Sequence, residues 1–152
     1  MMKILIDADG CPVVRQTVLI AEQFGIPCFV LCDTSHQFFY ENVIVCDRGA
    51  DSVDLRLVNL LEPGDLCVTQ DYGLAAMCLS RGGSAVSQDG LFYSEDNIGA
   101  LLEERALSGK LRRAGGRMKG PKKRTAAQDA AFEHALRHFL TQGSGSDGTE
   151  KI

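Results

Sequence analysis

The sequence predicts an α/β fold, a three-layer domain in which a mostly parallel sheet of four or five strands has helices on both faces. Short apolar runs alternate with helical patterns along the chain. These runs are apolar at consecutive positions, which is typical of parallel strands covered on both sides. The chain has 152 residues, of which 45% are hydrophobic and 24% charged, and this composition suits one globular domain.

The first half of the chain begins with a strand and a helix. The strand is expected at residues 3–6, which are mostly apolar. Pro12 suits the first turn of the following helix, because that turn leaves its N–H groups unpaired, and Gly25 ends the helix. Apolar residues at 26–31 and 43–46 predict the second and third strands.

The second half continues the alternation of helix and strand. A helix is expected at residues 51–61, where a proline-glycine turn ends it. The fourth strand is expected at residues 66–69, followed by a helix at 72–80 and a short fifth strand at 85–87. A further helix is expected near residues 95–107. Helices that connect parallel strands predict right-handed crossovers.

The chain ends with one more helix and a tail. The helix is expected at residues 125–140, and Thr125 and Gln128 have the spacing of a capping box at its start. Residues 143–152 are mainly glycine, serine and charged residues, which predicts a disordered tail. The single domain is therefore expected to cover residues 1–142.

The net charge of −4 conceals a strong asymmetry. Residues 110–124, here called the basic segment, hold eight lysines and arginines and no acid, so the rest of the chain carries −12. Lysine and arginine bind phosphates by releasing condensed counterions, which favours RNA as a partner. The alternative is a solvated loop. The residues expected to bind nucleic acid are Arg112, Arg113, Arg117, Lys119, Lys122, Lys123 and Arg124.

The six cysteines are expected to be reduced, structural thiols. The N-terminal residues reach Asp7 before the apolar region of a signal peptide can form, so we expect a cytoplasmic protein. No apolar run approaches the roughly 20 residues of a membrane helix. Cys28 and Cys32 lie four apart on an expected strand, which separates them by about 13 Å, too far for one zinc ion.

Aspartates follow two of the expected strands. Asp7 and Asp9 come at or just after the end of the first strand, and Asp71 follows the fourth. In the usual doubly wound order these strands are neighbours, and ligands bind beyond their carboxyl ends. The three carboxylates are therefore expected to meet in one crevice. The alternatives are a tight turn for Asp9 and a helix cap for Asp71.

A helix adds further carboxylates to this edge. Asp51 and Asp54 are three apart at the start of the helix at 51–61, so they share a face. The alternative is that both serve only as a cap and as partners of the helix dipole. Like charges this close need neutralising, and Mg²⁺ typically binds a few carboxylates with waters. The sequence therefore predicts a divalent-metal site with ligands drawn from Asp7, Asp9, Asp51, Asp54 and Asp71.

Five short motifs carry a resemblance to a known family. They are residues 7–12 (DADGCP), 48–54 (RGADSVD), 63–65 (PGD), 69–75 (TQDYGLA) and 119–124 (KGPKKR). Together they resemble the bacterial YaiI/YqxD family, which looks like a branch of the PIN-like nucleases. PIN-like nucleases use clustered acids and Mg²⁺ or Mn²⁺ to cut RNA. This resemblance implies catalytic roles for Asp7, Asp54 and Asp71, with Asp9 and Asp51 auxiliary.

The implied chemistry is metal-assisted hydrolysis of RNA, in which a metal-held water attacks the phosphate. This mechanism needs none of the histidines, and we expect His134 and His138 to lie at the surface. One alternative is an RNA-binding module without catalysis, which would use the basic segment and need no metal. A second is a phosphatase of the haloacid-dehalogenase kind, because residues 6–9 (IDAD) resemble its opening motif.

Overall fold

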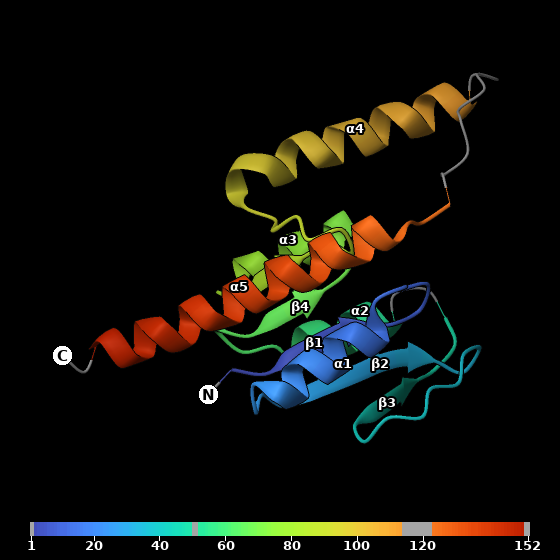
Figure 1. Cartoon of the computed structure of the whole chain (residues 1–152). Helices are drawn as coiled ribbons and strands as arrows, with labels where there is room; N and C mark the ends of the chain where they lie inside the picture. The colour runs from blue at the N-terminus through green and yellow to red at the C-terminus, as the bar shows by residue number, and fades with distance from the viewer. Residues whose placement is uncertain (1, 50–51, 114–122, 151–152) are drawn as a thin grey trace.

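The computed structural model describes residues 2–49, 52–113 and 123–150, and for 105–113 and 143–150 the backbone alone. Within these residues the chain forms a three-layer α/β domain (Figure 1). The sheet has five strands in the order β3-β2-β1-β4-β5, and all four strand pairs are parallel. The strands are β1 (Ile4–Asp7), β2 (Cys28–Asp33), β3 (Val43–Cys46), β4 (Leu66–Val68) and β5 (Ser84–Val86). The predicted fold class is confirmed.

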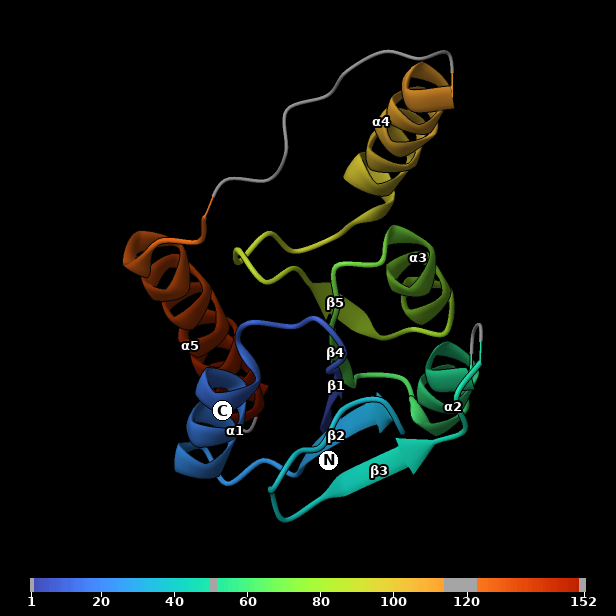
Figure 2. The ribbon, with the colours of Figure 1, turned by 90° about the vertical axis from the view of Figure 1, so that its right-hand side faces the viewer.

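Helices cover both faces of the sheet, as Figure 2 shows. On one face lie α1 (Val14–Gln23) and α5 (Ala126–Glu150), which pack against each other. On the other face lie α2 (Ser52–Leu60) and α3 (Tyr72–Ser80). Helix α4 (Glu95–Arg113) packs against α3. Within the described residues no helix is long and apolar enough to span a bilayer.

Alternate residues of each strand supply the two cores between these layers. Ile4 and Ile6 of β1 point toward the α1 and α5 layer, where they join Phe132 of α5. Leu5 points the opposite way and joins Leu57 of α2. Successive side chains of a strand alternate between faces, so a run that is apolar throughout fills both cores. This arrangement explains why the strands show no polar alternation.

The second strand lies two residues later than the sequence predicts. The prediction was 26–31, whereas β2 runs from Cys28 to Asp33. Its pairing with β1 decides this boundary, because Ile4 pairs with Cys28 and Asp7 with Leu31. The hydrophobic residues before Cys28 instead help to close the end of α1, where the N–H of Ile26 donates to the carbonyl of Ala21. The correction matters because it places Asp33 at the end of a strand.

Two helices are longer than predicted. Helix α4 continues past residue 107 to Arg113, and α5 continues past residue 140 to Glu150. In α4 each further residue adds a hydrogen bond at little cost once the helix has formed, so the apolar pattern underestimates its length. In α5 the glycines at 143, 145 and 148 each oppose the helix by about 1 kcal/mol, and nothing in the sequence explains its extension. The helix thus enters residues 143–152, where the sequence predicts a disordered tail. The division of the chain into a domain at 1–142 and a tail stays a prediction.

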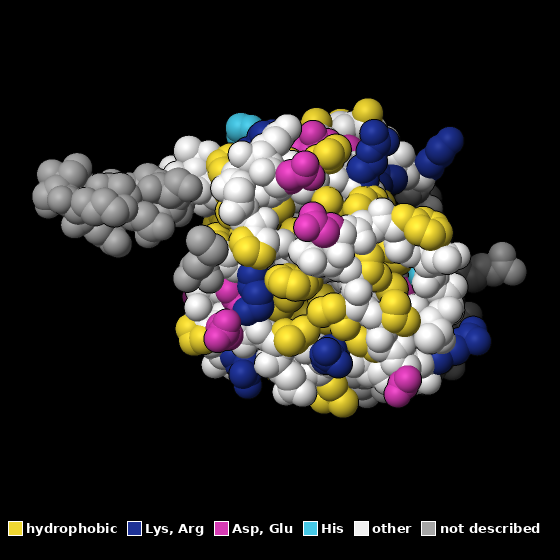
Figure 3. Space-filling model, turned by 90° about the horizontal axis from the view of Figure 1, so that it is seen from below, with side chains coloured by type: hydrophobic (Ala, Val, Ile, Leu, Met, Phe, Trp, Pro, Cys, Tyr) yellow, Lys and Arg dark blue, Asp and Glu magenta, His cyan; other side chains and the backbone are white. Residues whose placement is uncertain are grey.

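Hydrophobic side chains gather on the side of the molecule where β3 lies (Figure 3). β3 is an edge strand of the sheet. Val45 of β3 is 58% exposed, and Phe39, in the segment before β3, is 83% exposed.

Asp65 fixes the start of β1 against the turn before β4. Its carboxylate is buried and accepts hydrogen bonds from the backbone N–H groups of Lys3 and Glu62, at 3.0 and 2.8 Å. The ammonium group of Lys3 also lies 2.6 Å from Asp65 Oδ2. Residues 63–65, one of the five motifs, therefore have a structural role in this chain.

Replacing Asp65 with alanine is expected to lower the free energy of unfolding by about 2 kcal/mol, because two partly buried backbone N–H groups lose their acceptor and Lys3 loses its partner. Urea denaturation measures this loss. Glu62→Ala is the matched control, since the Glu62 side chain is 78% exposed and also contacts Lys3. An exposed pair contributes about 0–1 kcal/mol, so equal losses in the two variants would contradict the structural role of Asp65.

Candidate metal and catalytic site at the carboxyl edge of the sheet

Asp7 is the last residue of β1 and lies beside the end of β4. The register pairs Ile6 with Val68, so the residues that follow them, Asp7 and Thr69, also lie side by side. The hydroxyl of Thr69 donates a hydrogen bond of 2.8 Å to Asp7 Oδ2. The same hydroxyl oxygen accepts a 3.0 Å bond from the backbone N–H of Asp71. Thr69 therefore connects the ends of the two strands, which are neighbours as predicted.

Burial raises the pKa of Asp7 to about 6, and the negative charges of Asp54, Asp71 and Asp9 add to this effect. The hydrogen bond from Thr69 opposes it, because this bond stabilises the carboxylate. Four carboxylates thus interact at one edge of the sheet. A carboxylate that is both partly buried and surrounded by anions is stabilised by a bound cation.

Asp54 and Asp71 reach this edge from two helices. Asp54 lies in the first turn of α2. Asp71 is the N-cap of α3, and its Oδ1 accepts a 3.1 Å hydrogen bond from the backbone N–H of Leu74. The capping role considered for Asp71 is therefore confirmed. Its metal-binding role stays a prediction, as does that of Asp51, which lies outside the described residues.

A cavity of about 40 Å³ opens beside Asp7. This volume holds a small number of waters or one ion with part of its hydration shell. Gly10 shapes the cavity, because its φ of 77° lies in the left-handed region that glycine adopts without strain. The tight turn considered for Asp9 and Gly10 is thus present. The lining residues are Asp7, Asp9, Gly10, Cys11, Val68, Thr69, Gln70 and Gln88.

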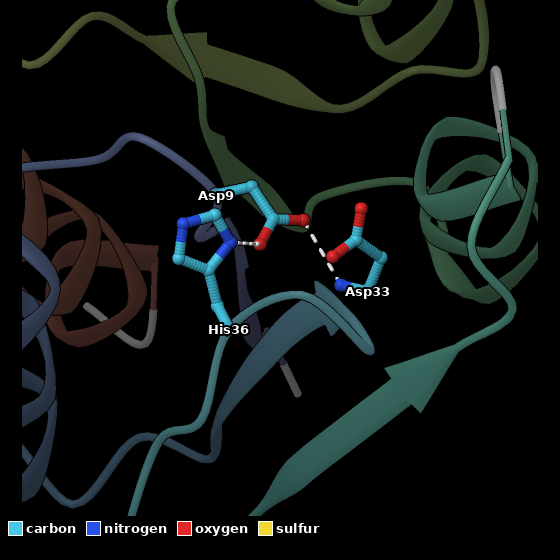
Figure 4. A group of neighbouring side chains, drawn as sticks. All are labelled: Asp9, Asp33 and His36. Atoms are coloured by element: carbon cyan, nitrogen blue, oxygen red, sulfur yellow. Dashed lines mark hydrogen bonds and ion pairs between the residues drawn. The ribbon is translucent and has the colours of Figure 1, made fainter.

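Asp9 contacts two residues that the sequence analysis did not select (Figure 4). Asp9 Oδ2 accepts a 2.9 Å hydrogen bond from the backbone N–H of Asp33, and Asp9 Oδ1 lies 2.7 Å from His36 Nδ1. Within the described part of the chain, Asp9, Asp33 and His36 are the one group of three whose possible ligand atoms all lie within 4.8 Å of one another. This group could hold a metal ion.

Asp33 could have been found from the sequence, and His36 could not. Asp33 ends β2, so the argument that selected Asp7 and Asp71 applies to it once the strand has its correct end. His36 lies in the segment between β2 and β3, where no hydrophobic periodicity indicates the direction of a side chain. The metal-assisted mechanism predicted from the sequence gave His36 no role.

The basic segment is only partly described by the structure. Arg117, Lys119 and Lys122 lie outside the described residues, and for Arg112 and Arg113 the structure gives only the backbone at the end of α4. Lys123 is exposed. Their contacts with nucleic acid stay predictions.

Arg124 anchors the end of the basic segment beside the cavity. Its Nε and Nη1 lie 2.6 Å from Asp129 Oδ1 and 2.8 Å from Asp89 Oδ1. Its Nη2 donates a 2.6 Å hydrogen bond to the backbone carbonyl of Gln88, a residue that lines the cavity. The Arg124 side chain is only 19% exposed, so it has a structural role besides any contact with RNA.

The remaining histidines and the cysteines match their predicted places. His134 and His138 are exposed on α5, with ring centroids 6.4 Å apart. All six cysteines of the chain are free thiols. Burial raises the pKa of the Cys11 thiol to about 11 and that of Cys28 to about 12, so neither forms a reactive thiolate near neutral pH.

The fold and the site define a parallel α/β domain with carboxylates gathered at the carboxyl edge of its two central strands. The chain belongs to the YaiI/YqxD family, whose model, described as an uncharacterized family, matches residues 5–142. A UPF0178 protein of Exiguobacterium sibiricum is 49% identical, over 93% of this chain and 98% of its own length. A UPF0178 protein of Ruminiclostridium cellulolyticum is 48% identical, over 99% and 100%. The resemblance inferred from the five motifs is confirmed.

Among solved structures, the chain is similar to the crystal structure of Rae1 (YacP) from Bacillus subtilis, a W164L mutant. The two are 15% identical, and the match covers 94% of this chain and 99% of the other, with a TM-score of 0.40. A likeness this distant carries no argument about the site.

Replacing Thr69 with valine is expected to raise the pKa of Asp7 above its value of about 6, because the lost hydroxyl stabilises the carboxylate. Carboxyl ¹³C NMR measures this pKa directly. Thr69→Ser keeps a hydroxyl at the same position and is expected to leave the pKa close to that of the wild type. A valine variant that titrates like the wild type would show that Thr69 does not stabilise the Asp7 carboxylate.

Proposed function

We propose that this protein is a divalent-metal-dependent nuclease that acts on RNA, of the PIN-like kind. The observation that carries this proposal is the partly buried Asp7, whose pKa is raised by burial and by the charges of Asp54, Asp71 and Asp9. Strongly shifted groups in a cavity are typical of functional sites. Here the shifted group, Asp7, lies at the carboxyl edge of a parallel sheet, where α/β proteins bind their ligands.

By their chemistry the donors at this edge suit Mg²⁺ or Mn²⁺, but in the described residues the oxygens of Asp7, Asp54 and Asp71 do not all lie within 4.8 Å of one another, so the side chains would have to close around the ion. Both ions prefer carboxylate oxygens, and Asp7, Asp54 and Asp71 supply these from β1, α2 and the cap of α3. When bound, such an ion polarises a phosphoryl oxygen and lowers the pKa of a bound water, which supplies the nucleophile. Asp7, Asp54 and Asp71 would hold the ion, with Asp51 auxiliary. Thr69 would keep the Asp7 carboxylate ionised and oriented.

The basic segment supplies the attraction for RNA that the acidic edge lacks. Arg124 contacts the backbone of Gln88, and Gln88 lines the same cavity as Asp7. One end of the basic segment therefore lies next to the carboxylates. Phosphates bound by Lys122 and Lys123 would then lie close to the proposed metal ion. A cytoplasmic location, where RNA is abundant, is part of the proposal.

Cleavage of a mixed single-stranded RNA in the presence of Mn²⁺ tests the nuclease function. We expect cleavage by the wild type and a loss of about a thousandfold with Asp7→Asn, since the metal contributes several kcal/mol to the transition state. Asp47→Asn is the matched control, because Asp47 is exposed and follows β3 at the same edge. RNA that is bound but never cut by the wild type would support the binding module without catalysis.

A further inference from the structure

We propose a second metal site, formed by Asp9, Asp33 and His36, that binds a divalent transition-metal ion such as Zn²⁺ or Co²⁺. This site is separate from the carboxylates around Asp7 and does not depend on nuclease activity. It reassigns Asp9, which the resemblance to PIN-like nucleases makes an auxiliary ligand of the first site.

The three side chains come from different parts of the chain and converge on one point (Figure 4). Asp9 lies in the turn after β1, Asp33 ends β2, and His36 follows in the next segment. Their possible ligand atoms all lie within 4.8 Å of one another. In a tetrahedral site, two ligands that are each about 2.1 Å from one ion lie about 3.4 Å apart, so a shift of up to about 1.4 Å completes the site. His36, which is 51% exposed, has the freedom to make it.

The shielded oxygen of Asp9 is a second observation that favours a bound cation. Asp9 Oδ1 is shielded from solvent and has no hydrogen-bond partner among the described residues. Its contact with His36 Nδ1 at 2.7 Å is an ion pair, which needs a protonated imidazole, and is not in the geometry of a hydrogen bond. Buried carboxylate oxygens are normally paired, because leaving one unsatisfied is costly. A metal ion bound by both atoms would satisfy this oxygen and use the lone pair of the imidazole.

Hydrogen bonds around the three residues orient the carboxylates. Asp33 Oδ1 accepts from the backbone N–H of Ser35 at 2.7 Å and also from the Ser35 hydroxyl. Asp9 Oδ2 accepts from the backbone N–H of Asp33, which leaves Oδ1 directed toward His36. Metal ligands are commonly fixed by such bonds from neighbouring groups. Asp9 and Asp33 are therefore positioned before any ion arrives.

The donor set predicts the kind of metal. One imidazole nitrogen and two carboxylates suit Zn²⁺ and Co²⁺, whereas Mg²⁺ prefers oxygen ligands alone. Three protein ligands leave a fourth position for water or for a ligand. Binding would also join the segment that holds His36 to the turn after β1. Because Mg²⁺ prefers oxygen ligands alone, an excess of Mg²⁺ should not displace Zn²⁺ from this site.

The test follows the ¹⁵N resonances of the His36 ring during titration of the full-length protein with Zn²⁺ in excess Mg²⁺. The starting protein carries His134→Gln and His138→Gln, because these two exposed residues stand four apart on α5 and can bind metal themselves. The chain has three histidines, so His36 is then the only one. We expect Zn²⁺ to shift the His36 ring nitrogens. No shift at any Zn²⁺ concentration would overturn the proposal.

Variants of the ligands separate this site from the first. Asp9→Asn and Asp33→Asn should each weaken Zn²⁺ binding by about tenfold or more, as should His36→Gln in a thermal-shift assay. Asp7→Asn and the exposed Asp47→Asn should leave the Zn²⁺-induced shift of His36 in place. Equal Zn²⁺ affinity in the wild type and in Asp33→Asn would refute the site. Loss of the His36 shift with Asp7→Asn would refute its separateness.

Discussion

The variant Asp7→Asn is expected to be more stable than the wild type in the absence of metal and to lose the stabilisation that Mn²⁺ gives. An aspartate has a pKa near 3.9 in an unfolded chain, whereas that of Asp7 is about 6 in the folded protein. Between these values the folded protein holds a proton that the unfolded chain has released. The wild type should therefore lose up to about 3 kcal/mol of stability as the pH rises from 4 to above 6.

Chemical denaturation at several pH values, with and without Mn²⁺, measures both effects. At pH 7 without metal, Asp7→Asn should gain about 1–3 kcal/mol, because the buried charge is gone. In the wild type, Mn²⁺ at a hundredfold excess over its Kd should add about 2.7 kcal/mol, since it binds the folded chain alone. A wild type whose stability stays flat between pH 4 and pH 7 would contradict the raised pKa of Asp7.

Asp71→Asn is a second test of the same site. Asparagine caps helices about as well as aspartate, so this variant should keep the hydrogen bond to Leu74 while it loses the charge. We expect it to fold normally and to lose its response to Mn²⁺. An unchanged Mn²⁺ response in both Asp7→Asn and Asp71→Asn would exclude the proposed site.

Replacing Lys119, Lys122 and Lys123 together with alanine is expected to weaken RNA binding and to flatten its dependence on salt. Each phosphate contact on single-stranded RNA contributes about 0.7 to the slope of log affinity against log salt, so three lost contacts remove about 2 units. Gel shifts over a series of salt concentrations measure this slope. Affinity should fall for all RNA sequences alike, because contacts with phosphates do not read bases.

Arg124 is kept out of this triple variant because its side chain also anchors the chain through Asp89 and Asp129. Changing it would mix a loss of structure with a loss of charge. Lys110→Ala, in the same segment but outside the motif at 119–124, is the matched control. An unchanged salt slope in the triple variant would identify the basic segment as a loop without a role in binding.

The sheet and the closeness of Asp7 to Asp71 could be predicted, because both follow from local patterns in the sequence. Apolar runs locate strands, and parallel strands bring their carboxyl ends to one edge. Within the sheet, only the residues at which the strands begin and end differ from the prediction. Because the predicted second strand ended two residues too early, Asp33 was not recognised as the residue that ends β2.

Other parts of the site depend on contacts between residues far apart in the sequence. Arg124 forms hydrogen bonds with Asp89 and Gln88, which precede it by 35 and 36 residues. No local sequence pattern predicts such a contact. The hydrogen bond from Thr69 to Asp7 likewise depends on the register of β1 against β4. The place of His36 beside Asp9 depends on the path of the segment between β2 and β3.

The anchoring of Arg124 has a kinetic consequence for the proposed nuclease. Arg124 is held by Asp89, in the turn after β5, and by Asp129 of α5, whereas Asp7 ends β1 and Asp71 caps α3. Loss of Asp89 or Asp129 would therefore change how RNA is captured and leave the reacting groups in place. Such variants would raise KM at constant kcat, while changes at Asp7 would lower kcat. Capture and turnover can then be adjusted independently, by substitutions at different residues around the same edge of the sheet.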